Sequence, residues 1–276
     1  MVLDAHTRCE TSIHGVSLDP QRRKSARLLM WDYELRGFRN PLWRGEPPEP
    51  ARMIIRLERQ LRMSMGSGEN LLPCMERNGI DRSVVLSVAP FNRMRESLRA
   101  CGEEPRRRIP FASARPYQDW EEELRRGMEG GRRGLKIHPL LQRLAPEGPF
   151  RFQPLEAFAP YGRPVIAHGG ELDYYMVKDG YAPCGDVRRL EPLIAAFPRV
   201  PFILGHTGPY HPERALELSR RSKRVYLESS SQTLEAVREA LGIAGREGVI
   251  FGSGWPASDS GYALRIARQA AGRTAS

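Results

Sequence analysis

The sequence predicts an α/β protein that folds as a (β/α)8 barrel, the TIM barrel. Three observations lead to this prediction: the chain length, the alternation of two hydrophobic patterns, and the number of strand-like segments. The 276 residues suffice for one large α/β barrel. Short apolar runs, typical of parallel strands that are covered on both faces, alternate with amphipathic segments typical of helices. A count of eight such runs predicts that the sheet closes on itself.

The eight predicted strands are spread along the whole chain. Each is a run rich in β-branched and other apolar residues, and most are followed by a helical pattern. Their predicted ranges are Val2–Thr7, Ser83–Pro90, Ile109–Pro116, Gly134–Pro139, Pro164–Gly170, Pro201–Gly208, Val225–Ser230 and Val249–Pro256. Strands that alternate with helices indicate βαβ units, in which neighbouring strands are parallel.

The predicted helices lie between these strands, and the first connection is unusually long. Helical patterns cover Asn70–Asn78, Trp120–Gly131, Val187–Phe197, Glu213–Arg221, Thr233–Ala244 and Tyr262–Ala271. Residues 10–68 contain two further helical patterns, Leu18–Arg36 and Ala51–Met65. We expect this helical insertion to lie on the catalytic face, as a lid or as the contact of a homodimer. One helix follows the eighth strand, so we expect a shortened C-terminus and a single domain over residues 1–276.

The composition is that of a soluble globular protein. The net charge of +10 comes from arginines scattered along the chain, without interleaved aromatic residues, so nucleic-acid binding is not predicted. No apolar run reaches the roughly 20 residues that a membrane helix needs, and the N-terminus lacks a signal-peptide pattern. We therefore expect a cytoplasmic protein with no nucleic-acid or membrane partner, whose four cysteines are free thiols.

The residues capable of chemistry gather at the carboxyl ends of the predicted strands, where α/β barrels place their active sites. Lys136 lies near the end of the fourth strand and Glu228 near the end of the seventh. Four of the six histidines also lie at strand ends: His6, His138, His168 and His206. A single histidine is more often a satisfied core group, but four at equivalent positions predict a shared polar pocket.

These strand ends resemble those of the amidohydrolase-related branch of the amidohydrolase superfamily. The motifs that carry the likeness are Val2–Thr7, Met75–Val85, Gly134–Pro139, Pro164–Gly170, Leu204–Gly208 and Ile250–Pro256. Each motif is weak alone, but six in order at strand-like spacing are typical of the family, and the likeness leaves out only the long insertion. It implies a TIM barrel and an activity among decarboxylases, hydratases, lactonases and other hydrolases.

The resemblance also implies a divalent metal site, from which this sequence departs at two positions. In the family the first strand ends His-x-His and both histidines bind the metal, but here they are His6 and Arg8. His168 matches a further ligand, and His206 matches the histidine that orients or activates the attacking water. Gly254 replaces the aspartate of the eighth strand. Zinc or manganese held by His6 and His168 is therefore disfavoured, because arginine cannot lose its proton and ligate.

The two replacements conserve charge. A divalent ion with one carboxylate ligand carries +1, as does Arg8 with Gly254. We therefore predict that the Arg8 guanidinium takes the place of the metal, that Gly254 leaves room for it, and that it binds a substrate carboxylate or a developing oxyanion. His206 or His168 would act as general base, and Lys136 would steady the anion.

The remaining site predictions complete this set. The predicted catalytic residues are His206, Arg8, Lys136 and His138, and the predicted substrate-binding residues are Arg8, Glu228, Trp255 and Tyr174. Glu228 has another interpretation, in which it bonds neighbouring hydroxyls or pairs with Arg8. Glu10, Cys9 or Glu228 would have to replace the lost ligands if a metal were bound.

The predicted function is hydrolysis of a small lactone, ester or related substrate that bears a carboxylate. The alternative is a catalytically inactive barrel, a pseudoenzyme, that binds a small anion or serves as a scaffold. Turnover of a panel of lactones and esters distinguishes the two.

Overall fold

The computed structural model describes most of the predicted barrel and little of the insertion. The described residues are 1–9, 12–13, 16–17, 50, 62–63, 66–88, 94–113, 119–142, 144, 152–170, 185–208 and 212–272. The helix predicted over Leu18–Arg36, nearly all of that over Ala51–Met65, and Tyr174 lie outside them. Within the insertion, β2 (Ser12–Ile13) pairs with β3 (Val16–Ser17) in antiparallel fashion, a feature that the sequence pattern did not predict.

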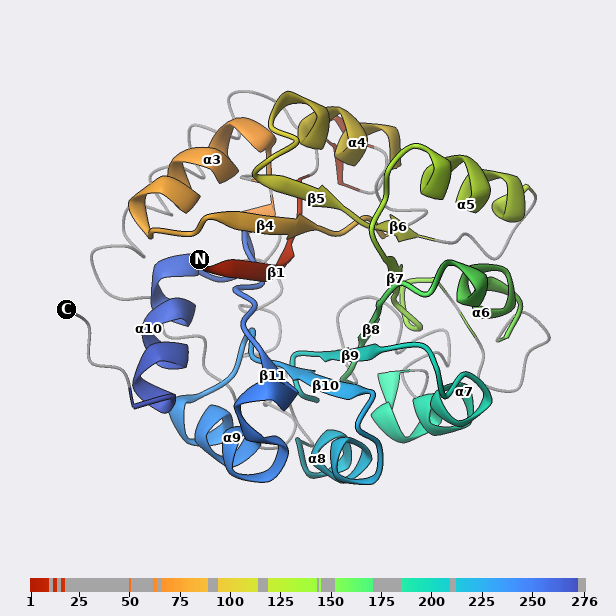
Figure 1. Cartoon of the computed structure of the whole chain (residues 1–276). Helices are drawn as coiled ribbons and strands as arrows, with labels where there is room; N and C mark the ends of the chain where they lie inside the picture. Colours follow the sequence, from red (N-terminus) through yellow and green to blue (C-terminus); the bar gives the residue numbers. More distant parts are fainter. Residues whose placement is uncertain are drawn as a thin grey trace.

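Eight predicted strands match the strands around the centre of Figure 1, and neighbouring strands pair in parallel. They are β1 (Leu3–Thr7), β4 (Arg82–Val85), β5 (Arg108–Pro110) continued by β6 (Ala112–Ser113), β7 (Leu135–Ile137), β8 (Val165–His168), β9 (Phe202–Gly205), β10 (Val225–Glu228) and β11 (Val249–Ile250). Each begins within one residue of its predicted start. Most end earlier than predicted, and residues such as Gly169 and His206 follow the strand instead of extending it.

Hydrogen bonds join the two main sheets at both seams. Between β5 and β6, the Phe111 N–H donates to the Val85 carbonyl at 3.0 Å, so one bent strand pairs with β4 on one side and β7 on the other. Just past β11, the Phe251 carbonyl accepts from the Ala5 N–H of β1 at 2.9 Å. The eight strands therefore form a continuous ring, as the fold prediction requires.

The helices lie outside this ring (Figure 1). They are α3 (Gly68–Arg77), α4 (Met94–Glu103), α5 (Trp120–Glu129), α6 (Gln153–Phe158), α7 (Glu191–Ala196), α8 (Pro212–Arg221), α9 (Leu234–Gly248) and α10 (Ser260–Ala270), with short 3-10 turns η2 (Ala159–Tyr161) and η5 (Val187–Leu190). The six helices predicted outside the insertion are all present, the one over Val187–Phe197 as η5 followed by α7. The sequence pattern did not predict α4 and α6.

Two layers of apolar side chains hold the barrel together. Alternate residues of β8 divide between them: Val165 and Ala167 pack in the large cluster that includes helical residues, whereas Ile166 packs with Val84 and Ile203 from other strands. The second cluster fills the barrel interior. This period of two, set by strand geometry, also decides which polar residues at the strand ends face inward.

The last helix, α10, begins at a side-chain cap. The Asp259 carboxylate accepts a hydrogen bond from the Tyr262 N–H at 2.6 Å. We expect Asp259→Ala to lower the free energy of unfolding by about 1 kcal/mol, because one backbone donor loses its partner. Urea denaturation measures this loss. Asp259→Ser should retain most of the stability, and equal losses in both variants would contradict the capping role.

Two further expectations concern the described residues. Cys9, Cys74 and Cys101 are buried and form no disulfide within the described residues, and Cys184 lies outside the described ranges. Within the described parts of the chain, every helix is too short or too polar to cross a lipid bilayer.

Candidate active site

The site is built where strands of the ring end. On β8, His168 lies two residues beyond the inward-facing Ile166, and on β10, Glu228 lies two residues beyond Tyr226. Because side chains alternate along a strand, His168 and Glu228 point into the barrel mouth. Lys136, the middle residue of β7, has flanking neighbours that pack toward the helices, so its side chain also points inward.

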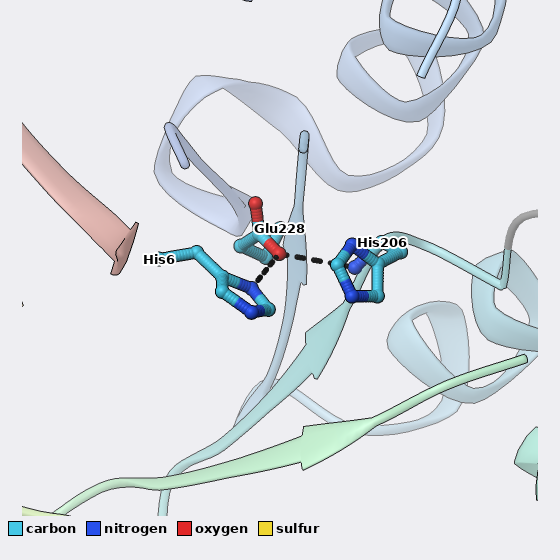
Figure 2. Close-up of side chains that lie close together, drawn as sticks. All are labelled: His6, His206 and Glu228. Carbon is cyan, nitrogen blue, oxygen red and sulfur yellow. Dashed lines mark hydrogen bonds and ion pairs between the residues drawn. The ribbon is translucent and has the colours of Figure 1, made fainter. Parts of the chain in front are cut away.

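Glu228 is the centre of the hydrogen-bond network at this mouth. Its Oε2 atom lies 2.7 Å from His6 Nδ1 and accepts from the His206 N–H at 3.0 Å and the Ser230 hydroxyl at 2.8 Å. Its Oε1 atom accepts from the Ser230 N–H at 2.5 Å. Figure 2 shows His6 and His206 on either side of this carboxylate. Since the side chain is fully buried and both oxygens have partners, Glu228 positions the histidines.

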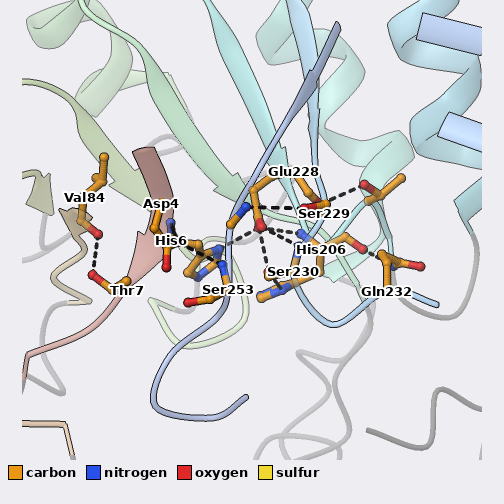
Figure 3. Close-up of polar contacts among 12 residues, drawn as sticks. Asp4, His6, Thr7, Val84, His206, Glu228, Ser229, Ser230, Gln232 and Ser253 are labelled. Atoms are coloured by element: carbon orange, nitrogen blue, oxygen red, sulfur yellow. Dashed lines mark hydrogen bonds and ion pairs between the residues drawn. The ribbon is translucent and has the colours of Figure 1, made fainter. Parts of the chain in front are cut away.

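The network also determines which nitrogen of each histidine carries the proton. The hydroxyl of Ser230 gives its only hydrogen to Glu228, so it must accept from His206 Nδ1, 2.7 Å away. The carboxylate likewise accepts from His6 Nδ1. Both rings therefore carry hydrogen on Nδ1 and leave an Nε2 lone pair for chemistry. Gln232 fixes the same segment by donating to the His206 carbonyl (Figure 3).

Three more groups surround these histidines. The His138 and His168 rings stack with centroids 3.8 Å apart, and the His168 ring meets His206 edge-on at 4.9 Å. Both ring nitrogens of His168 are buried without a hydrogen-bond partner, as is the Lys136 Nζ atom. Unsatisfied buried polar atoms are rare in native proteins, so these atoms mark a place for a ligand or water.

The electrostatics of the mouth follow from burial and two cations. Burial lowers the pKa of all four histidines well below the usual value, and the charges of Lys136 and Arg8 lower it further. The imidazoles are therefore neutral at pH 7. Burial and the Arg8 charge also lower the pKa of Lys136 to about 7, against the opposing effect of Glu228.

Asp4 ties the first strand to the loop after β11. Its Oδ1 atom accepts from the backbone N–H groups of His6 at 3.0 Å and Ser253 at 2.9 Å, and burial raises its pKa to about 7. Asp4 thus holds the His6 backbone in place (Figure 3). Neither Asp4 nor Ser230 was among the predicted site residues. Asp4 lies two residues before His6, and Ser230 lies two residues after Glu228. This spacing is the sequence signal that could have indicated both residues.

The described residues do not fit the metal site of the family. Their one close group of metal-ligand atoms comprises His6, His206 and Glu228, all within 4.8 Å of one another. Here His6 Nδ1 and Glu228 are only 2.7 Å apart, whereas two ligands of a tetrahedral zinc lie roughly 3.3 Å apart. The carboxylate is also occupied by four donors, and His168 is outside the group. Within that group two imidazole lone pairs remain, one on His6 and one on His206, fewer than the three protein ligands of a catalytic zinc.

Two predicted roles change. Trp255 was predicted to bind substrate, but its side chain is 2% exposed and packs in a hydrophobic cluster with Leu71 and Met75 of α3. It is a core residue. Glu228 was also predicted to bind substrate, but internal donors hold both of its oxygens. Its bond to the Ser230 hydroxyl agrees with the other interpretation, in which Glu228 bonds to neighbouring hydroxyls.

Gly254 lies beside Ser230, the residue that bonds to both Glu228 and His206. A Cβ atom there would lie 3.3 Å from Ser230 Cβ and 3.7 Å from Ser231 Oγ. The φ angle of 72° at Gly254 is also one that most side chains disfavour. The exchange of a metal and an aspartate for Arg8 and Gly254 stays a prediction, and the Arg8 charge acts on all four histidines of the mouth.

Comparison with known families gives one match over most of the chain. The family model described as Amidohydrolase matches residues 27–275. No curated protein matches this sequence at a significant level.

Solved structures with the same fold are numerous. An uncharacterized TIM-barrel protein from Bordetella bronchiseptica aligns with a TM-score of 0.64 at 17% identity, over 95% of this chain and 89% of that chain. 5-Carboxyvanillate decarboxylase from Sphingomonas paucimobilis aligns with a TM-score of 0.61 at 18% identity, over 98% of this chain and 92% of that chain. A probable 2-pyrone-4,6-dicarboxylic acid hydrolase from Acinetobacter baumannii was solved with citric acid bound. It aligns with a TM-score of 0.59 at 14% identity, over 98% of this chain and 92% of that chain. At these identities the likeness establishes the fold alone.

Proposed function

The chain belongs to the amidohydrolase family, and from that premise we propose that it hydrolyses a small lactone or ester bearing a carboxylate, without a metal in the family's ligand positions. The observation that carries this proposal is the His206 imidazole. It is neutral, it is oriented through Ser230 and Glu228, and its Nε2 lone pair lies in a mouth that also holds two cations.

In the proposed reaction His206 Nε2 removes a proton from water as the water oxygen adds to the carbonyl carbon. The resulting oxyanion is stabilised by the ammonium of Lys136, while the guanidinium of Arg8 binds the substrate carboxylate. The carbon–oxygen bond to the leaving group then breaks, and His206 returns the proton to the departing alcohol. A lactone gives a hydroxy acid.

Charge supports a carboxylate-bearing substrate. Arg8 and Lys136 bring positive charge to the mouth, and internal donors occupy the Glu228 carboxylate. A guanidinium binds a carboxylate through two parallel hydrogen bonds. The structural relatives named for a carboxyvanillate and a pyrone dicarboxylic acid are named for substrates with carboxylates, which agrees with this class.

The test is turnover of matched substrates by the purified protein. The panel contains lactones and aryl esters that carry a carboxylate, each beside its methyl ester. We expect turnover of at least one carboxylate member, slower turnover of its methyl ester, and loss of both in His206→Ala. Binding of the carboxylates without turnover would favour the alternative function, an inactive anion-binding barrel, which the same cations would also suit.

The pKa shifts predict an activity optimum on the acid side of neutrality. His206 acts as a base only when neutral, and its lowered pKa keeps it neutral well below pH 6.5. Lys136 stabilises the oxyanion only when protonated, and this form is lost as the pH rises through about 7. We expect kcat/KM to fall above pH 7 in the wild type and to lose this alkaline decline in Lys136→Met. A profile that still rises at pH 8 would rule out the role of Lys136.

A further inference from the structure

A second cavity lies at the opposite mouth of the barrel. It has a volume of about 450 Å³, within the range of small-molecule sites, and three arginines line it: Arg82, Arg133 and Arg163. Arg82 is the first residue of β4, and the other two each lie two residues before β7 and β8. These are amino ends of strands, whereas the histidines of the candidate active site lie at or near carboxyl ends.

The interior of this cavity is apolar. Its walls include Phe111, Ile166 and Ile203, which belong to the cluster that fills the barrel. Ile166 lies two residues before His168 on β8, so the cavity and the active site are separated by roughly 7 Å of strand. The cavity is therefore a distinct place in the fold, with walls of the same strands that carry the active site.

In the described part of the chain, no carboxylate pairs with the three guanidiniums at this cavity. Among the described residues none of the three makes a side-chain hydrogen bond or ion pair, and the cavity lining includes no acidic residue. The Arg82 Nε atom is buried without a partner. Arg133 and Arg163 are exposed at the rim. Other arginines of the described chain, such as Arg125 and Arg221, pair with glutamates.

We propose that this cavity binds an amphiphilic anion, a carboxylate with a medium-length alkyl or aromatic body. The apolar walls would cover the body, and the guanidiniums would bind the carboxylate in their paired geometry. A small inorganic anion leaves the walls exposed to water, and a neutral hydrocarbon leaves three cations unpaired. The proposal does not depend on the function assigned to the other mouth.

Octanoate binding to the full chain, measured by calorimetry, tests the proposal. We expect octanoate to bind at least tenfold more tightly than acetate, which lacks the body, or octanol, which lacks the charge. The double variant Arg133→Gln/Arg163→Gln should weaken octanoate binding at least tenfold. Its matched control, Arg238→Gln/Arg268→Gln, removes the same charge from exposed positions on α9 and α10 and should bind as the wild type does.

Because the active site also holds cations, Arg8→Gln distinguishes the two sites: it should weaken only binding at the active site and leave the octanoate binding that depends on Arg133 and Arg163. Loss of binding in Arg8→Gln but not in Arg133→Gln/Arg163→Gln would move the ligand to the active site and overturn the proposal. Absence of octanoate binding, equal binding of octanol, or equal weakening in both arginine pairs would also overturn it. A failure of octanoate binding would leave the proposed hydrolase activity untouched, and a failure of turnover would leave the proposed cavity ligand untouched.

Discussion

Replacing His206 by alanine is expected to lower kcat for lactone or ester hydrolysis by about 10²- to 10⁴-fold, the range of general-base contributions. The loss should be the same for carboxylate substrates and their methyl esters, because the base acts on water and not on the carboxylate. Steady-state kinetics with one matched pair measures both.

Ser230→Ala is the matched control for the His206 variant. It leaves the imidazole in place but removes the oxygen that accepts from His206 Nδ1, so the ring loses its fixed tautomer and orientation. We expect an intermediate loss of kcat with little change in KM. Activity of His206→Ala equal to that of the wild type would remove His206 from the mechanism.

Replacing Arg8 by glutamine is expected to lower kcat/KM for a carboxylate substrate by about 10- to 100-fold. This loss corresponds to the contribution of one charge-assisted interaction to binding. The methyl ester should lose much less, because it offers no negative charge to the guanidinium. This selectivity distinguishes Arg8 from His206. Arg8→Lys should restore only part of the loss, since an ammonium lacks the paired geometry. Equal losses for both substrates would show that Arg8 does not bind the carboxylate.

The strands could be predicted because buried parallel strands carry their own signal. Val165–His168 is apolar up to its terminal histidine, and the preceding Gly-Arg-Pro segment ends the chain's helical pattern sharply. Short helices carry less signal. With six residues, Gln153–Phe158 completes fewer than two turns, so no periodicity can develop. The two strands in the insertion have two residues each, which is also too short for an alternating pattern to develop.

The site was predictable in its residue types but not in its connections. The strand-end positions of His6, His168 and His206 followed from the barrel, because all strands end at one mouth. Ser230 bonds to Glu228 and His206, whereas the adjacent Ser229 does not. This choice depends on how the chain turns after β10. The burial of Trp255 depends on α3, which packs against it from a distant part of the sequence. Such facts need three-dimensional packing.

The measurement that tests the central claim most directly is the metal content of the active protein. We predict that protein turning over its substrate at full rate contains far less than one divalent ion per chain by elemental analysis. Dialysis against a strong chelator should leave kcat unchanged. About one zinc or manganese per chain, lost together with activity on chelation or in His6→Ala and restored by adding the ion, would contradict the claim that Arg8, Lys136 and His206 perform the reaction without a metal.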